Sequence, residues 1–262
     1  MNYEMIDFHT HPYIDEAHGI CYYKDVCKMS ASQAKEYLQG LGITKICGSA
    51  LVPTGREVSW AEIQKTNDEA LRAKDFFGEF YELGFHVHAG FVKQSVKEID
   101  RMRAHGARLV GELVPYTHGW TYGDKGFDEI LTALDGQGLP VSFHSIYGAP
   151  DNEKHIDEMV QKHPNIAFVA AHPGEKESYL RHIDRMKRFK NYYLDLSGTG
   201  LFRFGMLAYG VAQVGSERFL MGSDFPVCDP SMYLSSIMTD PFLTETEKKN
   251  ILCDNAKRIL KL

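Results

Sequence analysis

Short apolar segments rich in strand-forming residues alternate with amphipathic helical patterns from one end of the chain to the other. This alternation restricts the fold more than any other feature, because parallel strands joined by helical crossovers need both of their faces buried. The predicted strands are Met5–Phe8, Thr44–Val52, Phe85–Val92, Ala107–Val114, Leu139–His144, Ile166–His172, Tyr192–Leu196 and Arg218–Gly222.

The segments between these strands carry helix signals. One of them has apolar side chains at i, i+3, i+4 and i+7, namely Phe127, Ile130, Leu131 and Leu134. Capping-box spacing predicts that helices begin after Ser30 and Thr244. Eight strand–helix units predict an α/β protein, a single-domain (β/α)8 TIM barrel over residues 1–262. The alternative is a doubly wound open sheet, but that fold would carry a glycine-rich phosphate turn after its first strand, where this chain has His-Thr-His-Pro.

Composition excludes several classes of protein. The net charge of −6 argues against a nucleic-acid-binding surface. No apolar run approaches the roughly 18 residues of a membrane span. The five cysteines are scattered without zinc-ribbon spacing, which fits a reducing compartment. With no basic and apolar leader at the N-terminus, we expect a cytoplasmic protein.

His9 and His11 end the first predicted strand, and side chains at i and i+2 of a strand share a face. The two imidazoles can therefore converge on one metal ion. The simpler interpretation is a pair of surface or hydrogen-bonded histidines, so the motif alone decides nothing.

Later strands also end in metal-ligating residue types, and a barrel gathers strand ends at its carboxyl-terminal face. These candidates are Glu112, His144, His172 and Asp224. Together with His9 and His11 they predict a divalent metal site, with Zn²⁺ the first choice and Mn²⁺ or Fe²⁺ as alternatives.

A second His-x-His pair, His86 and His88, is interpreted differently. The apolar run continues past it to Val92, so we expect both histidines in the barrel core or toward its opposite face.

With these residues the chain resembles the amidohydrolase superfamily of metal-dependent barrel hydrolases. It is most similar to the amidohydrolase-related branch that contains aminocarboxymuconate semialdehyde and resorcylate decarboxylases. The resemblance covers nearly the whole chain. It rests on Asp7-Phe8-His9-Thr10-His11, Phe143-His144, Ala171-His172-Pro173-Gly174, Met221-Gly222-Ser223-Asp224-Phe225-Pro226 and Asp254-Asn255-Ala256-Lys257-Arg258-Ile259-Leu260.

The resemblance implies that the metal ligands are His9, His11, His144 and Asp224. It implies that Asp224 also exchanges a proton with a metal-bound water, and that His172 contacts this water in one-metal members or joins the second metal in two-metal members. One ion is expected, with two as the alternative.

Glu112 departs from that pattern. In having a glutamate on the fourth strand, the chain resembles the TatD-type deoxyribonucleases, in which a carboxylate bridges two metals. The other interpretations are that Glu112 pairs with a nearby arginine or lysine, or that it binds substrate.

The expected function is metal-dependent hydrolysis of a small-molecule amide, ester or lactone by a metal-bound water. The alternatives are non-oxidative decarboxylation of an aromatic or unsaturated acid, a TatD-like nuclease, which the acidic charge opposes, and a non-catalytic binding protein. A homo-oligomer is left open. Candidate substrate contacts at the mouth are Tyr13, Arg56, Tyr116, Trp120, Tyr147 and Arg203.

Overall fold

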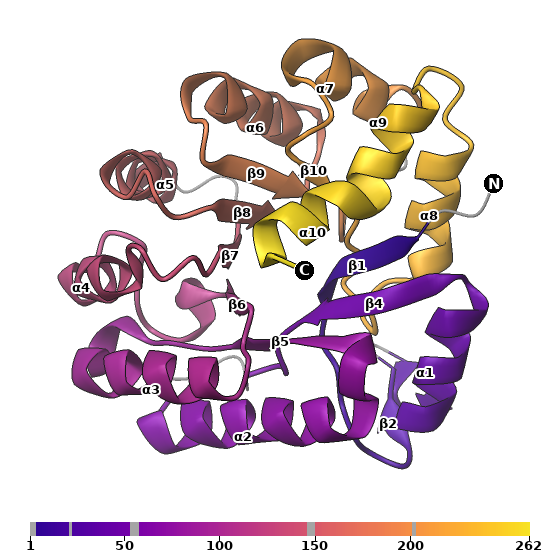
Figure 1. Ribbon diagram of the computed structural model, residues 1–262. Coiled ribbons are helices and arrows are strands. Elements are labelled where there is room, and N and C mark those ends of the chain that lie inside the picture. Colours follow the sequence, from indigo (N-terminus) through magenta and orange to yellow (C-terminus); the bar gives the residue numbers. More distant parts are fainter. Residues whose placement is uncertain (1–3, 21–22, 53–57, 146–149, 201–202) are drawn as a thin grey trace.

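The computed structural model describes residues 4–20, 23–52, 58–145, 150–200 and 203–262. Eight parallel strands form a nearly closed barrel with helices around it, so the predicted TIM barrel is confirmed (Figure 1). In order around the barrel the strands are β1 Met5–Thr10, β4 Ile43–Gly48, β5 Tyr81–Phe85, β6 Leu109–Leu113, β7 Val141–His144, β8 Phe168–Ala171, β9 Tyr192–Asp195 and β10 Phe219–Leu220.

Hydrogen bonds between β1 and the segment after β10 close the barrel. The Phe8 amide donates to Met221 O at 2.9 Å. The Asp224 amide donates to His9 O at 2.7 Å, and the His11 amide donates to Phe225 O at 2.7 Å. The first and last strands are therefore held together at the positions where both carry candidate metal ligands.

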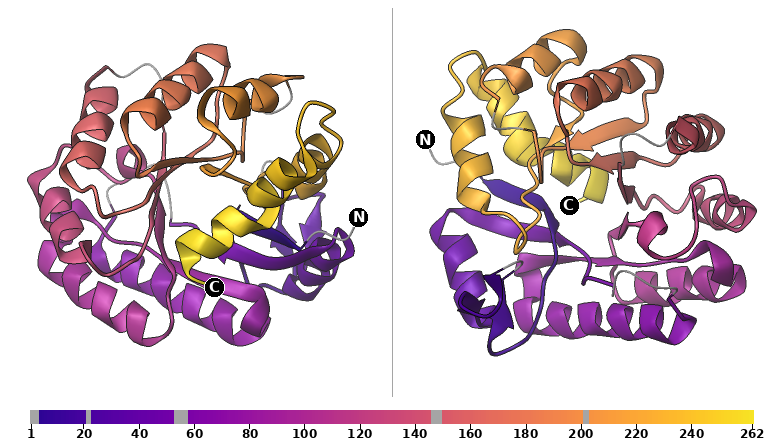
Figure 2. Two further views of the ribbon diagram at one scale, coloured as in Figure 1. Left: turned by 45° about the horizontal axis from the view of Figure 1, so that its top comes forward. Right: turned by 180° about the vertical axis from the view of Figure 1, so that it is seen from behind.

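Helices cover the outside of the barrel (Figure 2). The α-helices are α1 Ala31–Gly40, α2 Trp60–Phe77, α3 Val92–Ala104, α4 Lys125–Leu134, α5 Pro150–Lys162, α6 Lys176–Arg188, α7 Met206–Val214, α8 Pro230–Met238, α9 Glu245–Lys249 and α10 Asn255–Leu260. Shorter elements are the hairpin β2 His18–Gly19 with β3 Lys28–Met29, the 3-10 turns η2 Gly78–Phe80, η3 Ala89–Phe91 and η4 Pro115–Thr117, and the π-helix η5 Asn250–Asp254. The capping boxes at Ser30 and Thr244 are both present, and the predicted apolar face of α4 is buried. No helix among the described residues is long and apolar enough to cross a bilayer.

The C-terminal helix covers the end of the barrel opposite the histidines. Ala256, Ile259 and Leu260 of α10 pack against side chains from the beginnings of several strands in one apolar cluster. Members of that cluster from the barrel include Ile6, Leu109, Val169 and Leu220. In Figure 1 α10 lies across this end. Chemistry is thereby restricted to the other end, where the strands terminate.

One predicted strand was wrong. The strand lies at Tyr81–Phe85 rather than Phe85–Val92, and the apolar residues that follow begin η3 and α3. The strand does not continue here, because His88 caps the start of η3: its Nδ1 accepts a hydrogen bond from the Gly90 amide at 3.0 Å. His86 and His88 therefore lie just beyond the carboxyl end of β5, on the same side as His9 and His11, and not toward the opposite face.

Candidate metal centre

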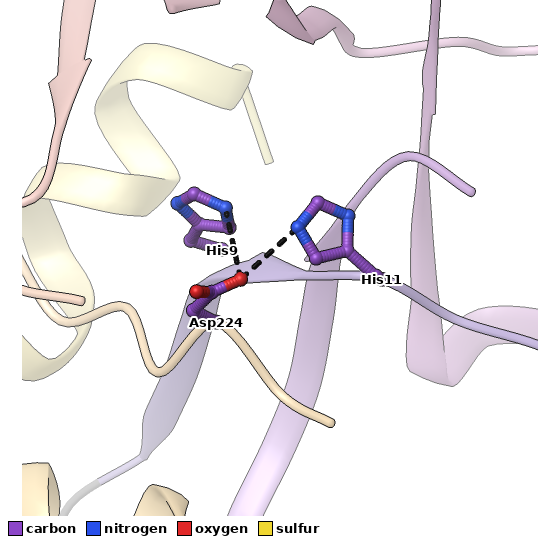
Figure 3. A group of neighbouring side chains, drawn as sticks. All are labelled: His9, His11 and Asp224. Carbon is purple, nitrogen blue, oxygen red and sulfur yellow. Dashed lines mark ion pairs between the residues drawn. The ribbon is translucent and has the colours of Figure 1, made fainter. Parts of the chain in front are cut away.

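The end of β1 and the loop after β10 bring His9, His11 and Asp224 together (Figure 3). Asp224 Oδ1 lies 3.1 Å from His11 Nε2 and 3.7 Å from His9 Nε2. The three side chains come from segments more than 200 residues apart in sequence, joined by the hydrogen bonds that close the barrel. Two imidazole nitrogens and one carboxylate oxygen thus face a common point.

A second group lies beside the first, formed by Glu112 of β6, His144 of β7 and His172 after β8. Glu112 Oε1 lies 2.9 Å from His144 Nδ1 and 3.4 Å from His172 Nε2. The other oxygen of Glu112, Oε2, lies 3.3 Å from His9 Nε2 and 3.6 Å from His11 Nε2. Glu112 therefore contacts imidazoles of both groups, and a third group, His9, His172 and Asp195, also joins them.

These side chains fit a divalent cation. Imidazole nitrogens with carboxylate oxygens suit zinc, manganese or iron. His9 is 3% exposed, and its Nε2 is buried without a hydrogen bond from any described residue. Because leaving a buried polar atom unsatisfied is costly, this atom points to a partner that the polypeptide itself does not supply.

Neighbouring groups orient the two histidines of β1. His11 Nδ1 lies 2.9 Å from Ser49 O, and because a carbonyl only accepts, the proton sits on Nδ1 and the lone pair on Nε2. His9 Nδ1 lies 3.0 Å from Asp195 Oδ2. Carboxylate and carbonyl partners of this kind fix the ring and raise the basicity of the ligating nitrogen.

Ser197 connects His9 to His172. Its Oγ lies 3.1 Å from His9 Nδ1 and 3.0 Å from His172 Nδ1, and it donates to Asp195. The backbone between Asp195 and Ser197 is held as well, since the Ser197 amide donates to Asp195 Oδ1 at 3.0 Å. The short segment from the last residue of β9 to Ser197 thus contacts a histidine from each group.

Backbone conformation contributes to the arrangement. His172 has a φ of 72° and Asp224 a φ of 66°, the left-handed region that side chains other than glycine rarely adopt. Such strain persists where surrounding contacts hold it, and it concentrates at functional sites. Gly222 gives His9 its space, because a Cβ there would lie 2.8 Å from His9 Cβ.

Asp7 and Ser223 tie β1 to the loop that carries Asp224. The Ser223 amide and hydroxyl donate to the Asp7 carboxylate at 2.9 and 2.5 Å. Asp7 is completely buried, and burial raises its pKa to about 7. This pair supports the backbone of the Gly-Ser-Asp segment rather than the reacting groups.

The cluster favours positive charge. Burial lowers the pKa of His9, but the Asp195 and Glu112 carboxylates outweigh it and hold that pKa well above its usual range. Burial raises the pKa of Glu112, but the charge on His9 and hydrogen bonds from His144 and His172 outweigh it and hold that pKa well below its usual range. The pKa of Asp195 is likewise lowered, because His9 outweighs burial. A bound cation satisfies the same carboxylates.

Comparison with known proteins identifies the family. The family model described as amidohydrolase matches residues 6–262. The chain belongs to this amidohydrolase family. No curated protein matches its sequence.

Solved structures similar to this amidohydrolase share its barrel over nearly the full length of both chains. The 2,6-dihydroxybenzoate decarboxylase from Rhizobium is 14% identical with a TM-score of 0.77, covering 99% of each chain. The 5-carboxyvanillate decarboxylase from Sphingomonas paucimobilis is 15% identical with a TM-score of 0.73, covering 99% of each chain. A dihydroxybenzoic acid decarboxylase from Polaromonas with bound manganese is 15% identical with a TM-score of 0.70, covering 100% of this chain and 98% of its own. At these identities the likeness shows the fold.

The predicted substrate contacts lie in different surroundings in this amidohydrolase. Tyr116 is 52% exposed, and its ring centroid lies 5.5 Å from that of His144, so it borders the cluster. Trp120 is buried and packs on Phe127 at a ring distance of 4.8 Å. Arg203 forms an ion pair with Glu175 on the surface. Tyr13 stacks on the ring of His18 at 3.9 Å. Arg56 and Tyr147 lie outside the described residues.

Sequence reasoning missed two residues of the cluster, Asp195 and Ser197. Asp195 ends β9 and Ser197 follows two residues later, and a carboxylate at the end of a barrel strand is the same signal that singled out Asp224. Neither residue belongs to the motifs that carry the family resemblance.

Proposed function

We propose that this amidohydrolase is a divalent-metal-dependent enzyme that removes CO2 from a small aromatic or unsaturated carboxylic acid. The observation that carries the proposal is the convergence of His9, His11 and Asp224 beside the shared carboxylate of Glu112. Support for decarboxylation over other metal-assisted reactions comes from the similar structures, several of which are decarboxylases of hydroxylated benzoates.

The residues that would hold the cation are His9, His11 and Asp224, with Glu112, His144 and His172 beside them. A divalent cation bound there would polarise substrate oxygen atoms as a Lewis acid. The donor set accommodates Zn²⁺, which we expected first, as well as the manganese found in a similar structure.

Asp224 is the proposed proton donor. Its side chain is 11% exposed while the two histidines it contacts are 3% and 4% exposed, so its carboxyl group is the member of this trio that best reaches the mouth. In the reaction the bond from the substrate carbon to the carboxylate breaks and its electron pair stays on that carbon. A proton from Asp224 then completes a new C–H bond as CO2 departs, and solvent returns the proton to Asp224.

Tyr116 would bind the body of the substrate. Its half-exposed ring stands next to His144 at the edge of the cluster, where it offers a flat face to an aromatic acid. Trp120 would support Tyr116 indirectly, because it packs the loop after β6 against Phe127 of α4. Arg56, Tyr147 and Arg203 stay candidates for contacts to a substrate anion or ring.

Hydrolysis of an amide, ester or lactone is a second candidate, and one observation favours it. Glu112 contacts imidazoles of both groups, an arrangement suited to holding two cations, which is common among metal-dependent hydrolases. In that reaction Asp224 would take a proton from the attacking water and His172 would stabilise the developing oxyanion. We expect no cleavage of DNA or RNA.

Product analysis tests the proposal. Protein loaded with Mn²⁺ or Zn²⁺ is incubated with hydroxylated benzoates, including 2,6-dihydroxybenzoate and 5-carboxyvanillate, and with a panel of simple lactones, esters and amides. We expect CO2 release from at least one acid and loss of that release when the metal is chelated. Turnover of the ester or lactone panel alone would replace the proposal with the second candidate, and no turnover of either panel would count against both.

A further inference from the structure

We propose that His182 of α6 is a positioning residue of the cluster that acts through Ser145 on the backbone carrying His172, a role that rests on the metal-dependent function proposed above. Three buried hydrogen bonds make the connection. His182 is completely buried, although it comes from a helix that covers the barrel and not from a strand. It therefore acts on the cluster from behind, through the backbone, and does not itself meet substrate.

Ser145 is the link between His182 and the cluster. It directly follows His144, which ends β7. Its hydroxyl donates to Ala171 O at 2.6 Å and lies 3.3 Å from His172 O. These two oxygens belong to the peptide groups on either side of the His172 α-carbon. One hydroxyl thus ties the chain next to His144 to the backbone that sets the position of His172.

The backbone of His172 needs this support. Its φ of 72° is unfavourable for a residue with a side chain, and such a conformation persists only where the surrounding structure determines it. Gly198 and Ser197 hold the ring itself, because a Cβ on Gly198 would collide with His172 Nδ1, and Ser197 Oγ lies 3.0 Å from the same atom. Without the Ser145 hydrogen bond the backbone could relax, and His172 Nε2, now 3.4 Å from Glu112 Oε1, would be displaced.

The direction of each hydrogen bond in this chain is fixed by the carbonyl at its end. A carbonyl only accepts, so the Ser145 proton points to Ala171 O. The Ser145 oxygen then accepts from His182 Nε2, 3.4 Å away, which leaves the lone pair of the neutral ring on Nδ1. Tyr192 of β9 supplies the matching donor, because its hydroxyl lies 2.8 Å from His182 Nδ1. His182 therefore donates on one side and accepts on the other, as only a neutral imidazole can.

The surroundings keep the His182 ring neutral. Burial, with the nearby charge of Arg185, lowers the pKa of His182 to about 3. Arg185 is itself buried and is held in place by Asp157, whose Oδ1 accepts from its Nε at 2.6 Å. A buried polar chain in which each nitrogen of the ring has a partner makes the structure rigid and specifies one arrangement. Rigidity is the property that the strained backbone at His172 requires.

The test is a Co²⁺ titration of metal-free protein, read by the visible absorption of the bound ion, which reports the geometry of its ligands. Loss of a group that orients a ligating histidine typically weakens metal binding by about 10-fold to 100-fold, and His182 acts at one further remove. We therefore expect His182→Leu to weaken Co²⁺ binding by about 10-fold and to change the spectrum. His182→Gln, whose amide nitrogen can donate to Ser145, should restore most of the wild-type spectrum and affinity.

His163→Leu is the matched control. His163 is also buried, but its Nε2 lies 3.0 Å from Asp128 Oδ1, beside α4 on the outside of the barrel. This variant removes a buried histidine with its hydrogen bond, and it should bind Co²⁺ with the wild-type affinity and spectrum.

Wild-type affinity and spectrum in folded His182→Leu would overturn the positioning role while leaving the metal-dependent function intact. The same spectral change in His163→Leu, or no recovery in His182→Gln, would also overturn it, because the effect would then come from general loosening of the fold. If His182→Leu does not fold, Tyr192→Phe decides, since loss of one hydroxyl should change the spectrum in the same direction and an unchanged spectrum would overturn the role. Absence of Co²⁺ binding by the wild type would instead overturn the proposed function.

Discussion

Two His-x-His pairs follow strands of this barrel, and both are buried. His9 and His11 end β1, and His86 and His88 come just after β5 on the same side. The rings of the first pair face Asp224 and Glu112 through their Nε2 atoms. The Nε2 atoms of the second pair lie 2.7 Å from Ala50 O and 2.9 Å from His118 O.

The difference shows what makes a histidine pair a metal site. In the first pair the backbone or a carboxylate takes Nδ1, which frees Nε2 for a ligand. In the second pair the backbone takes Nε2, and no ion pair with a carboxylate is formed within the described residues. The spacing of the motif is the same in both, so the partner of each ring nitrogen decides the role.

The largest effect is expected at Asp224, the carboxylate that faces the first pair. Asp224→Asn removes the proposed proton donor while keeping shape, and a positioned acid or base typically contributes about 100-fold to 10,000-fold. We predict a loss of kcat in that range, measured as CO2 release or ester turnover, with an unchanged circular dichroism spectrum. Full activity in this variant would remove Asp224 from the mechanism.

The second prediction concerns the pH dependence of stability, to which His86 of the second pair contributes. Burial lowers the pKa of His86 to about 4 from its usual 6.5, so the folded protein keeps this ring neutral while the unfolded chain protonates it. The unfolded state thus binds more protons between pH 4 and 6.5, and the free energy of unfolding rises with pH across this window by at most about 3 kcal/mol.

His86→Gln isolates that contribution. We predict that the variant has a shallower rise in the free energy of unfolding between pH 4 and 6.5, measured by urea titration of metal-free protein at each pH. An identical pH profile for variant and wild type would mean that His86 does not stay neutral in the fold.

A smaller effect is expected at Asp195, the partner that His9 has and the second pair lacks. Loss of a carboxylate that orients a ligating histidine typically weakens metal binding by about 10-fold to 100-fold. Asp195→Asn should lower Mn²⁺ affinity in that range, measured by competition with a chelating indicator. Unchanged affinity would show that Ser197 alone positions the ring.

The sequence predicted the barrel and most of its strands because each strand is a short apolar run that ends in turn or polar residues. It failed at Phe85–Val92, where an apolar run begins a helix, and a side chain-to-backbone hydrogen bond from Gly90 to His88 marks the boundary. Hydrophobic periodicity does not reveal such a hydrogen bond. The predicted position of His86 and His88, in the core or toward the opposite face, was therefore wrong.

The candidate site could be predicted as a set of strand-end residues but not as two groups. Which imidazole meets which oxygen of Glu112 depends on rotamers and on the left-handed backbone at His172 and Asp224. The orienting roles of Asp195 and Ser197 likewise depend on the packing of β9 against β10 and β1. These are tertiary facts that spacing along one chain does not encode.

Mn²⁺ binding by His11→Asn and His88→Asn, one variant from each pair, shows which histidine pair holds the metal. We predict that His11→Asn weakens Mn²⁺ binding by more than about 100-fold, because it removes a ligand rather than a ligand's partner. His88→Asn should bind Mn²⁺ as the wild type does. Equal losses in the two variants, or wild-type affinity in His11→Asn, would contradict the assignment of the metal centre to the first pair.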